Sequence, residues 1–139
     1  MSKIVFVGGV WDLFHVGHLN LFQKAKEYGD TLIVGVSSHS LVFHYKGLYP
    51  VIPFNDRIKI VRNISCVDKA VAQYELADVN LLKVLKVDVF VTGDDWKDKK
   101  DPPEGYAWIK ENLEMVFLPR TEGISSTSIK KELNRRNSL

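Results

Sequence analysis

The sequence predicts an α/β protein, a three-layer sandwich around a mostly parallel five-stranded sheet, and three observations favour this fold. Short apolar runs bounded by turn residues are typical of strands buried on both faces of a sheet. Helical patterns, with apolar residues at three- and four-residue spacing, lie between these runs, and this alternation favours parallel strands. Distinctive polar residues follow the apolar runs, as at the ligand-binding edge of an open parallel sheet. The 139 residues suit one domain, which we expect to span residues 1–139.

The individual elements can be placed in order along the chain. We expect strands at residues 4–7, 31–36, 67–71, 87–92 and 115–118. We expect helices at residues 19–28, 55–64, 77–85, 104–112 and 126–133. Charged residues followed by two prolines predict a surface loop over residues 97–105. The predicted architecture is therefore Rossmann-like.

Composition and charge narrow the class of protein. The chain is 45% hydrophobic and 26% charged, which is typical of a globular protein. A net charge of +2 does not indicate a nucleic acid or a membrane as partner, and the basic segment 130–136 is interpreted as a solvated helix end. No apolar run approaches the ~20 residues that span a bilayer. Without a signal-peptide pattern or a possible internal disulfide, we expect a cytoplasmic protein in which the single cysteine, Cys66, is a buried, unreactive thiol.

A first candidate site follows the first predicted strand. Gly8 and Gly9 follow that strand, and His15, Gly17 and His18 mark the start of the next helix. The segment matches neither the G-x-x-x-x-G-K-[ST] phosphate loop nor the G-x-G-x-x-G dinucleotide turn. Paired glycines let a ligand approach the backbone closely, a helix N-terminus attracts anions, and two histidines three residues apart can face one phosphate. The segment therefore predicts a phosphate site. It does not predict a zinc site, because no third ligand stands at a suitable spacing.

The segment Gly-Val-Trp-Asp-Leu-Phe-His-Val-Gly-His also resembles a family signature. It is similar to the H-x-G-H motif of the nucleotidyltransferase superfamily, which includes cytidylyltransferases, pantetheine-phosphate adenylyltransferase and class I aminoacyl-tRNA synthetases. The resemblance implies that His15 and His18 stabilise the α- and β-phosphates of a nucleotide in the transition state. It also places Val10 and Asp12 in the nucleotide site. It implies the reaction type, but neither the base nor the acceptor.

A second candidate site precedes the last predicted helix. Ser125 or Ser126 is suited to cap that helix, whose first N–H groups could hold the β- and γ-phosphates, and Arg120 would add a fork of donors. The segment resembles the R-T-x-G-I-S-[ST]-T-x-I motif of the cytidylyltransferases that act on glycerol-3-phosphate, phosphocholine and phosphoethanolamine. This resemblance favours CTP over ATP. It adds four residues to the expected nucleotide site: Thr121, Gly123, Ile124 and Thr127.

The turn after the fourth predicted strand carries a third resemblance. The sequence Asp88-Val89-Phe90-Val91-Thr92-Gly93-Asp94-Asp95-Trp96 looks like the nucleoside-binding turn of the bacterial glycerol-3-phosphate cytidylyltransferases. Carboxylates accept hydrogen bonds from ribose hydroxyls, so the resemblance implies that Gly93, Asp94 and Asp95 contact the nucleoside. Taken together, the resemblance extends over residues 3–133, with all motifs in the family's order.

The middle of the chain resembles the family's flexible lysine loop and the arginine-containing helix after it. The resemblance implies that Lys46 reaches the α-phosphate or the acceptor phosphate and that Arg57 orders this region. Before Val-Asp the family commonly has Arg-Tyr, and that Arg binds nucleotide phosphates, whereas this chain has Ser65-Cys66. Arg62 lies one helical turn earlier and is the candidate to replace that cation.

These motifs predict transfer of CMP from CTP to a phosphorylated alcohol, with release of pyrophosphate. A phosphate monoester has a second pKa of about 6, so its attacking oxygen is largely ionised at pH 7 and needs no general base. The expected catalytic groups position the phosphates and neutralise their charge together with a bound Mg²⁺. These groups are His15, His18, Lys46 and Arg120.

The acceptor is the open part of this prediction. The resemblance favours glycerol-3-phosphate, which would give CDP-glycerol for polymers of the cell surface. Phosphocholine or phosphoethanolamine is an alternative, because Tyr45, Tyr49, Tyr74 and Trp96 could surround an ammonium group. An adenylyltransferase that uses ATP with a sugar phosphate or a flavin precursor is a second alternative, suggested by Ser65. A non-catalytic nucleotide-binding regulator is a third. Members of the family are usually homodimers, so the resemblance implies a homodimer.

Overall fold

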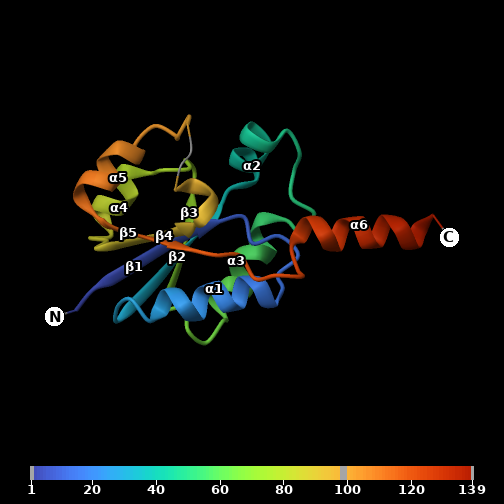
Figure 1. The fold of residues 1–139 in the computed structure, drawn as a ribbon, viewed down its shortest axis with the longest axis horizontal. Coiled ribbons are helices and arrows are strands. Elements are labelled where there is room, and N and C mark those ends of the chain that lie inside the picture. Colours follow the sequence, from blue (N-terminus) through green and yellow to red (C-terminus); the bar gives the residue numbers. More distant parts are fainter. Residues whose placement is uncertain (1, 98–99, 139) are drawn as a thin grey trace.

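The computed structural model describes residues 2–97 and 100–138, and its core is one parallel sheet (Figure 1). The sheet runs in the order β3-β2-β1-β4-β5, and every pairing is parallel. Its strands are β1 (Ile4–Gly9), β2 (Thr31–Ser37), β3 (Lys69–Gln73), β4 (Val89–Gly93) and β5 (Glu114–Leu118). The prediction of an α/β fold with a mostly parallel five-stranded sheet is confirmed.

Helices cover both faces of the sheet. They are α1 (Val16–Lys26), α2 (His39–Lys46), α3 (Phe54–Arg62), α4 (Val79–Val84), α5 (Tyr106–Asn112) and α6 (Ser126–Asn137), with a 3-10 turn, η1, at Asp94–Trp96. Helices α1 and α3 lie on one face, and α4 and α5 lie on the other (Figure 1). The three predicted layers are therefore present.

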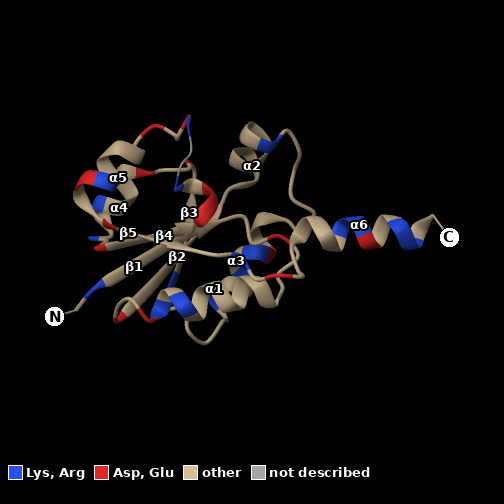
Figure 2. Cartoon of the chain, in the orientation of Figure 1, with Lys and Arg blue, Asp and Glu red and all other residues tan. Residues whose placement is uncertain are grey.

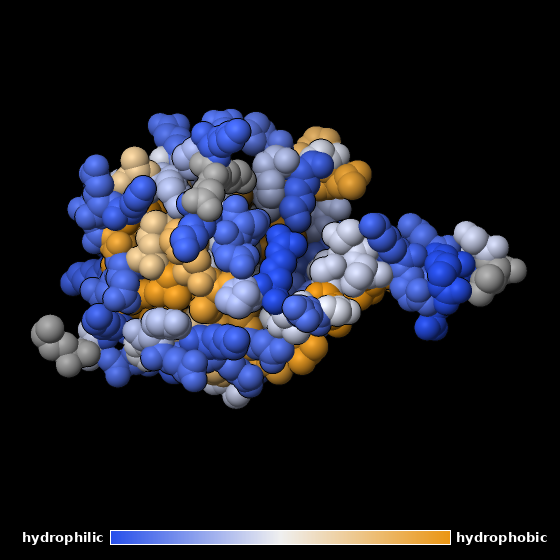
Figure 3. Space-filling view, in the orientation of Figure 1, coloured by the Kyte–Doolittle hydropathy of each residue, from blue (hydrophilic) through white to orange (hydrophobic). Residues whose placement is uncertain are grey.

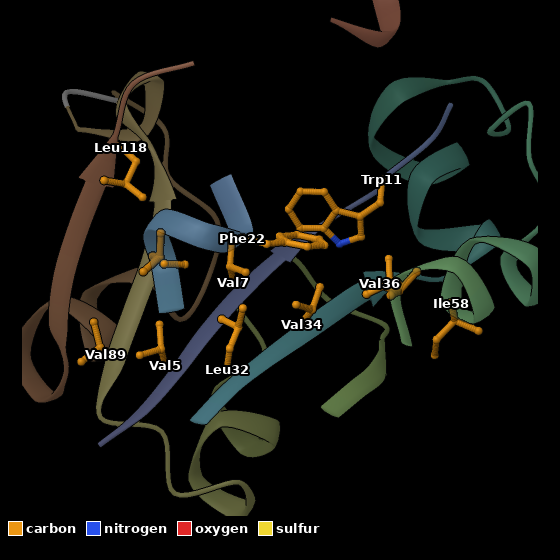
Figure 4. Packing of buried hydrophobic residues seen from close by; sticks show 13 residues of the cluster. Val5, Val7, Trp11, Phe22, Leu32, Val34, Val36, Ile58, Val89 and Leu118 are labelled. Atoms are coloured by element: carbon orange, nitrogen blue, oxygen red, sulfur yellow. The ribbon is translucent and has the colours of Figure 1, made fainter. Parts of the chain in front are cut away.

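Alternate side chains of the central strand divide the core into two clusters. Val5 and Val7 of β1 point toward α1 and α3, where they pack in one cluster with Phe22 (Figure 4). Phe6, between them, points to the other face and packs in a second cluster with Ile109 of α5. This is the two-residue period of a strand buried on both sides. Side chains of this kind stabilise the fold by about 1.5–3 kcal/mol each when fully buried.

The sequence analysis does not predict α2, the helix that carries Lys46. Ser38 caps its start, because the Ser38 hydroxyl accepts a hydrogen bond from the Leu41 N–H at 3.1 Å. Gly47 ends it in the left-handed conformation with φ of 75°, which a glycine adopts without strain. Lys46 therefore lies in the last turn of a short helix, and the expected loop begins only after it.

Several element boundaries also differ from the prediction. Strand β3 begins two residues later than expected, because the Asp68 carboxylate accepts the Leu32 N–H at 2.7 Å and pairs with Lys26. Helix α5 begins after Gly105, which has a left-handed φ of 94°. Residues 100–105 lie outside any helix or strand, as the predicted loop requires, and residues 98 and 99 of that loop lie outside the described residues. Cys66 is partly rather than fully buried, and this burial raises the pKa of its thiol.

Helix α6 differs from the others because it projects from the body of the molecule (Figure 1). None of its described residues is buried. Charged residues occur along its far half (Figure 2), the surface of which is mainly hydrophilic (Figure 3), and Glu132 pairs there with Arg135 and Arg136. The interpretation of residues 130–136 as a solvated helix end agrees with the exposure of this far half, but it is wrong for Lys130, which is half-buried and lies 3.4 Å from the Asp12 carboxylate. Within residues 2–97 and 100–138, no helix combines the length and the apolar character needed to cross a membrane.

Candidate active site

An open cleft of about 1030 Å³ lies at the carboxyl ends of the strands. Strand β1 is followed along the chain by β2 on one side, while β4 lies on its other side, so the strand order reverses next to β1. Such a switch point is the usual ligand site of an open parallel sheet. The cleft brings together residues from the ends of β1, β2, β4 and β5 and from the starts of α1 and α6. All the site residues predicted from the sequence line it, except for Arg57, Arg62, Asp94 and Gly123.

The two predicted histidines form the start of α1. His15 is the N-cap, and its Nδ1 accepts the Gly17 N–H at 3.0 Å. The Nδ1 of His18 accepts the His15 N–H at 3.3 Å, so the two residues make a reciprocal capping box. Because both Nδ1 atoms accept hydrogen bonds, both neutral rings carry their proton on Nε2. Each ring therefore keeps one N–H donor that the helix cap does not use.

Gly17 is required by this arrangement. The two imidazole rings stack with their centroids 3.8 Å apart. A Cβ atom at Gly17 would come within 2.8 Å of the His15 ring, which is closer than carbon atoms can approach. The glycine between the histidines therefore lets the His15 ring fold over the first turn of the helix.

Both histidines are neutral at pH 7. Burial lowers the pKa of His15. Burial and the neighbouring His15 lower the pKa of His18 to about 4, although the charge of Asp12 opposes them. The pair therefore offers hydrogen-bond donors rather than positive charges to a phosphate.

The loop before α1 is anchored in the core. The Trp11 indole N–H donates to the Gly35 carbonyl oxygen at 2.9 Å, and its ring packs edge-on against both His18 and Phe22. Trp11 and Leu13 have positive φ values of 57° and 50°, which are uncommon for residues with bulky side chains. Gly9 leaves room for the indole, because a Cβ there would lie 2.8 Å from it. The packing thus holds a strained loop that fixes the position of the histidines.

Asp12 joins three segments of the site. It is buried, and its two carboxylate oxygens accept the N–H groups of Val51 and Ile52 at 2.8 and 2.9 Å. Its carbonyl oxygen accepts the Ser126 hydroxyl at 2.6 Å, and its carboxylate lies 3.4 Å from the Lys130 ammonium. Burial alone would raise the pKa of Asp12, but the two N–H groups and Lys130 outweigh it, so the pKa lies below its usual value. The sequence analysis places Asp12 in the nucleotide site. In the structure both oxygens of its carboxylate already contact protein groups, namely two backbone N–H groups and the Lys130 ammonium.

The two predicted auxiliary arginines lie outside the cleft. Arg57 is buried, and its guanidinium donates to the carbonyl oxygens of Val10, Ser37 and Ile52 at 2.8 to 2.9 Å. These bonds tie the segment after Lys46 to the chain at the ends of β1 and β2. Arg62 is exposed at the end of α3 and does not line the cleft.

Positive side chains gather on the side of the cleft between α2 and α6. Partial desolvation lowers the pKa of Lys46, and the nearby charges of Lys130 and Arg120 act in the same direction, while Asp12 opposes them. The Arg120 guanidinium lies 3.5 Å from the Asp95 carboxylate, and both side chains are exposed. These cations can neutralise the oxygens of a polyphosphate.

The start of α6 repeats the capping pattern of α1 with hydroxyl groups. The Ser125 hydroxyl accepts the Ser128 N–H at 3.0 Å, and the Ser128 hydroxyl accepts the Ser125 N–H at 2.9 Å. Nearby, the Asn20 amide of α1 donates to the Thr121 hydroxyl at 3.3 Å, which connects the two helix starts. Two helix N-termini therefore open on the same cleft, and each favours an anion.

Among the residues that line the cleft, the sequence analysis assigns no site role to Gln73 and Lys130. Gln73 is buried at the end of β3, and its amide N–H groups donate to the carbonyl oxygens of Glu75 and Leu76. Its carbonyl oxygen occupies the space that Gly8 leaves free, because a Cβ at Gly8 would lie 2.3 Å from it. Lys130 could have been found from its spacing, since it stands four residues after Ser126 on one face of α6.

Comparisons with known proteins agree with this architecture. The family model described as cytidylyltransferase-like matches residues 6–132. A glycerol-3-phosphate cytidylyltransferase of Bacillus spizizenii is 36% identical over 132 residues, covering 94% of this chain and 97% of that protein. The bifunctional protein HldE of Helicobacter acinonychis is 37% identical over 135 residues, but this chain, 96% of which aligns, spans only 28% of its length. The crystal structure of a lipopolysaccharide core biosynthesis protein from Thermoplasma volcanium superposes with a TM-score of 0.73 at 24% identity, covering 88% of this chain and 100% of that one.

Proposed function

Because this chain belongs to the cytidylyltransferase-like family, we propose that it transfers CMP from CTP to the phosphate of a phosphorylated alcohol, with glycerol-3-phosphate as the acceptor. The chain is a nucleotidyltransferase enzyme by this membership. The observation that carries the proposal is the pair of helix starts in one cleft, which is lined by neutral histidine donors, a serine-capped helix and a group of cations.

In this reaction the acceptor phosphate oxygen forms a bond to the α-phosphorus of CTP, and the bond from that phosphorus to the bridging oxygen of the β-phosphate breaks. The electron pair leaves with pyrophosphate, so no proton has to be removed from the nucleophile. The Nε2–H groups of His15 and His18 donate to phosphate oxygens, where charge develops in the transition state. The start of α6 and Arg120 hold the β- and γ-phosphates, and Lys46 holds the α-phosphate or the acceptor phosphate.

Mg²⁺ is part of the proposal. No group of three or more His, Cys, Asp or Glu side chains that could hold a metal occurs in residues 2–97 and 100–138. Mg²⁺ commonly keeps several waters and binds through substrate phosphates with only one or two carboxylates. The proposed Mg²⁺ would therefore bind mainly through the triphosphate oxygens, because the exposed carboxylate on the cleft, Asp95, lies beside Arg120 and is the expected partner of the ribose hydroxyls. The metal would neutralise charge on the phosphate oxygens.

CTP is preferred because the glycerol-3-phosphate cytidylyltransferase of Bacillus spizizenii matches along 97% of its length. Two alternative choices of substrate are each supported by one observation. Ser65 stands where the family commonly has Arg, which leaves ATP with a sugar phosphate or a flavin precursor as a second pair of substrates. Tyr45, Tyr49 and Trp96 line the cleft and suit the ammonium group of phosphocholine. We further propose that the enzyme acts as a homodimer in the cytoplasm.

The test is pyrophosphate release by the purified chain with Mg²⁺. CTP and ATP are each offered with glycerol-3-phosphate, phosphocholine, phosphoethanolamine and a set of sugar phosphates. We expect the highest kcat/KM for CTP with glycerol-3-phosphate. A higher value for ATP with a sugar phosphate would replace the proposed substrates, and absence of release with every pair would overturn the proposed reaction. Sedimentation of the purified chain tests the homodimer.

A further inference from the structure

Gln73 is a buried polar residue of the cleft to which the proposed reaction gives no role. It is the last residue of β3, and its exposed fraction is only 3%. Its Nε2 donates to the carbonyl oxygens of Glu75 and Leu76 at 2.8 and 2.9 Å. Because both partners are acceptors, the amide nitrogen must point toward them and the amide oxygen must point away. The turn after β3 therefore fixes the orientation of this amide.

The amide oxygen of Gln73 lies over the two neighbouring strands. A Cβ atom at Gly8 of β1 would lie 2.3 Å from it, and one at Gly35 of β2 would lie 2.6 Å from it, so the amide fits only because both residues are glycine. In the part of the chain that the structure describes, no group donates a hydrogen bond to this oxygen. A buried acceptor without a donor lowers stability and offsets the gain from the two N–H bonds. Stability alone therefore does not account for a glutamine at this position.

The two N–H bonds of Gln73 determine the shape of the turn that follows β3. They reach the carbonyl oxygens two and three residues ahead, so they close the chain over the end of the strand. Leu76, the second of these partners, is a residue of the cleft wall. Gln73 thus controls the position of Leu76 through the backbone of the turn.

The place of this wall in the sheet indicates which substrate it faces. Strands β2 and β3 lie on one side of β1, and β4 and β5 lie on the other. The expected nucleotide contacts of Gly93, Asp95 and Arg120 follow β4 and β5, whereas α2, with Lys46, follows β2. Among residues 37–76, all of which the structure describes, Lys46 is the only charged side chain that lines the cleft. This half of the cleft therefore suits a ligand with one phosphate and an uncharged remainder.

We propose that Gln73 is a positioning residue for the acceptor. By fixing the turn after β3, it holds Leu76 against the carbon chain of the acceptor, while Lys46 binds the acceptor phosphate. The proposal rests on the proposed function, because it assigns a specificity-determining wall to the same site. It also describes the class of acceptor, which is a phosphate ester whose carbon chain carries no charge.

The test compares Gln73→Met with Asn80→Leu. Methionine has a length similar to that of glutamine but no N–H donors, and Asn80 carries an amide that is exposed on α4 and does not line the cleft. We expect Gln73→Met to raise KM for the acceptor roughly 5- to 30-fold, because the turn loses both hydrogen bonds. In the same variant KM for CTP and kcat should change less than about threefold, and Asn80→Leu should leave all three constants unchanged.

Leu76→Ala tests whether Gln73 acts through Leu76. This variant should show the same selective rise in KM for the acceptor, and the double variant Gln73→Met/Leu76→Ala should be no worse than Leu76→Ala, because the two residues act in one chain of contacts. Fully additive effects, or an equal rise in both KM values, would mean that Gln73 supports the cleft as a whole, and the proposal would be overturned. If Gln73→Met does not fold, a normal KM for the acceptor in Leu76→Ala would still overturn it.

Calorimetric titration separates this proposal from the proposed function, because it needs no turnover. Glycerol-3-phosphate and inorganic phosphate are each titrated into Gln73→Met and Asn80→Leu. Weaker binding of glycerol-3-phosphate by Gln73→Met, with equal binding of inorganic phosphate by the two variants, supports the role of Gln73 even if the wild-type chain does not use CTP. Equal binding of glycerol-3-phosphate contradicts that role even if CMP transfer is confirmed.

Discussion

The starts of α1 and α6 use the same hydrogen-bond pattern in very different surroundings. Both are reciprocal capping boxes that open on one cleft, made by His15 and His18 in α1 and by Ser125 and Ser128 in α6. The imidazoles of α1 are stacked and packed against the aromatic core, whereas the serines of α6 are at the surface. A capping box alone thus indicates only where a helix begins. The packing around the capping residues determines how rigid that part of the site is.

The two helices also differ in what holds them. Helix α1 buries Phe22 and Ala25 completely, so its start can move only with the core. Helix α6 has no buried residue among those described, and a helix of 12 residues is marginal in water by itself. The contacts of Ser126 and Lys130 with Asp12 attach its first two turns to the body. We infer that α1 supplies fixed donors, while α6 adjusts to the substrate.

Removal of a fixed donor should have the largest effect. We expect His18→Ala to fold and to lose about 10²- to 10³-fold in kcat, because its Nε2–H is held where charge develops and no side chain can move in to replace it. Steady-state pyrophosphate release measures this loss, and circular dichroism checks the fold. His44→Ala is the matched control, since His44 is exposed on α2 and does not line the cleft. A folded His18→Ala enzyme with nearly normal kcat would remove the histidine pair from the mechanism.

Acidification should act on the same region with a smaller effect. The pKa values of His15 and His18 in the folded chain lie below their ordinary value of 6.5, and that of His18 is about 4. Between pH 4 and pH 6.5 the unfolded chain binds more protons than the folded chain. The stability that the neutral histidines contribute is therefore fully present above pH 6.5 and is lost as the pH decreases toward 4. After allowance for partial exposure of the rings, the loss is on the order of 1 kcal/mol, or roughly 4 °C in unfolding temperature.

Thermal unfolding at pH 7 and pH 5 measures this dependence. The His18→Gln variant removes the titrating ring, so its unfolding temperature should change less between the two pH values, while His44→Gln should behave like the wild type. An equally steep dependence in His18→Gln would assign the effect to other groups. Because the histidines are neutral already at pH 7, kcat should not decrease between pH 7 and 8 through loss of their charge.

The contrast between the two helix starts also explains what the sequence could predict. Strands such as β1 and β2 are apolar on both faces, so their residues identify them without knowledge of their neighbours. The H-x-G-H segment and the serine-rich segment are local in sequence, because each cap is formed by residues three apart. The sequence therefore predicts both segments as candidate sites, and the structure brings both to one cleft.

Features that depend on distant residues could not be read in the same way. Helix α2 has few apolar positions facing the core, and its ends are set by Ser38 and Gly47, so the segment resembles a loop in sequence. Asp12 was assigned to the nucleotide, but its partners Val51 and Ile52 lie about forty residues away along the chain. Gln73 was missed because the predicted strand ended two residues before it. Tertiary contacts fix each of these roles.

Loss of the serine cap should have the smallest effect and the most local one. In Ser125→Ala the Ser128 N–H loses its acceptor, at a cost near the low end for an N-cap, about 0.5 kcal/mol, because water can reach the exposed start of α6. Since α6 buries no described residue, this loss should open α6 without unfolding the core. Hydrogen exchange should therefore become about twofold faster in the α6 amides and stay unchanged in those of α1, and KM for CTP should rise a few-fold. Ser138→Ala, at the other end of α6, is the control. If Ser125→Ala instead lowered the unfolding temperature as much as acidification does, α6 would be part of the cooperative core, and the distinction between a fixed and an adjustable helix start would be wrong.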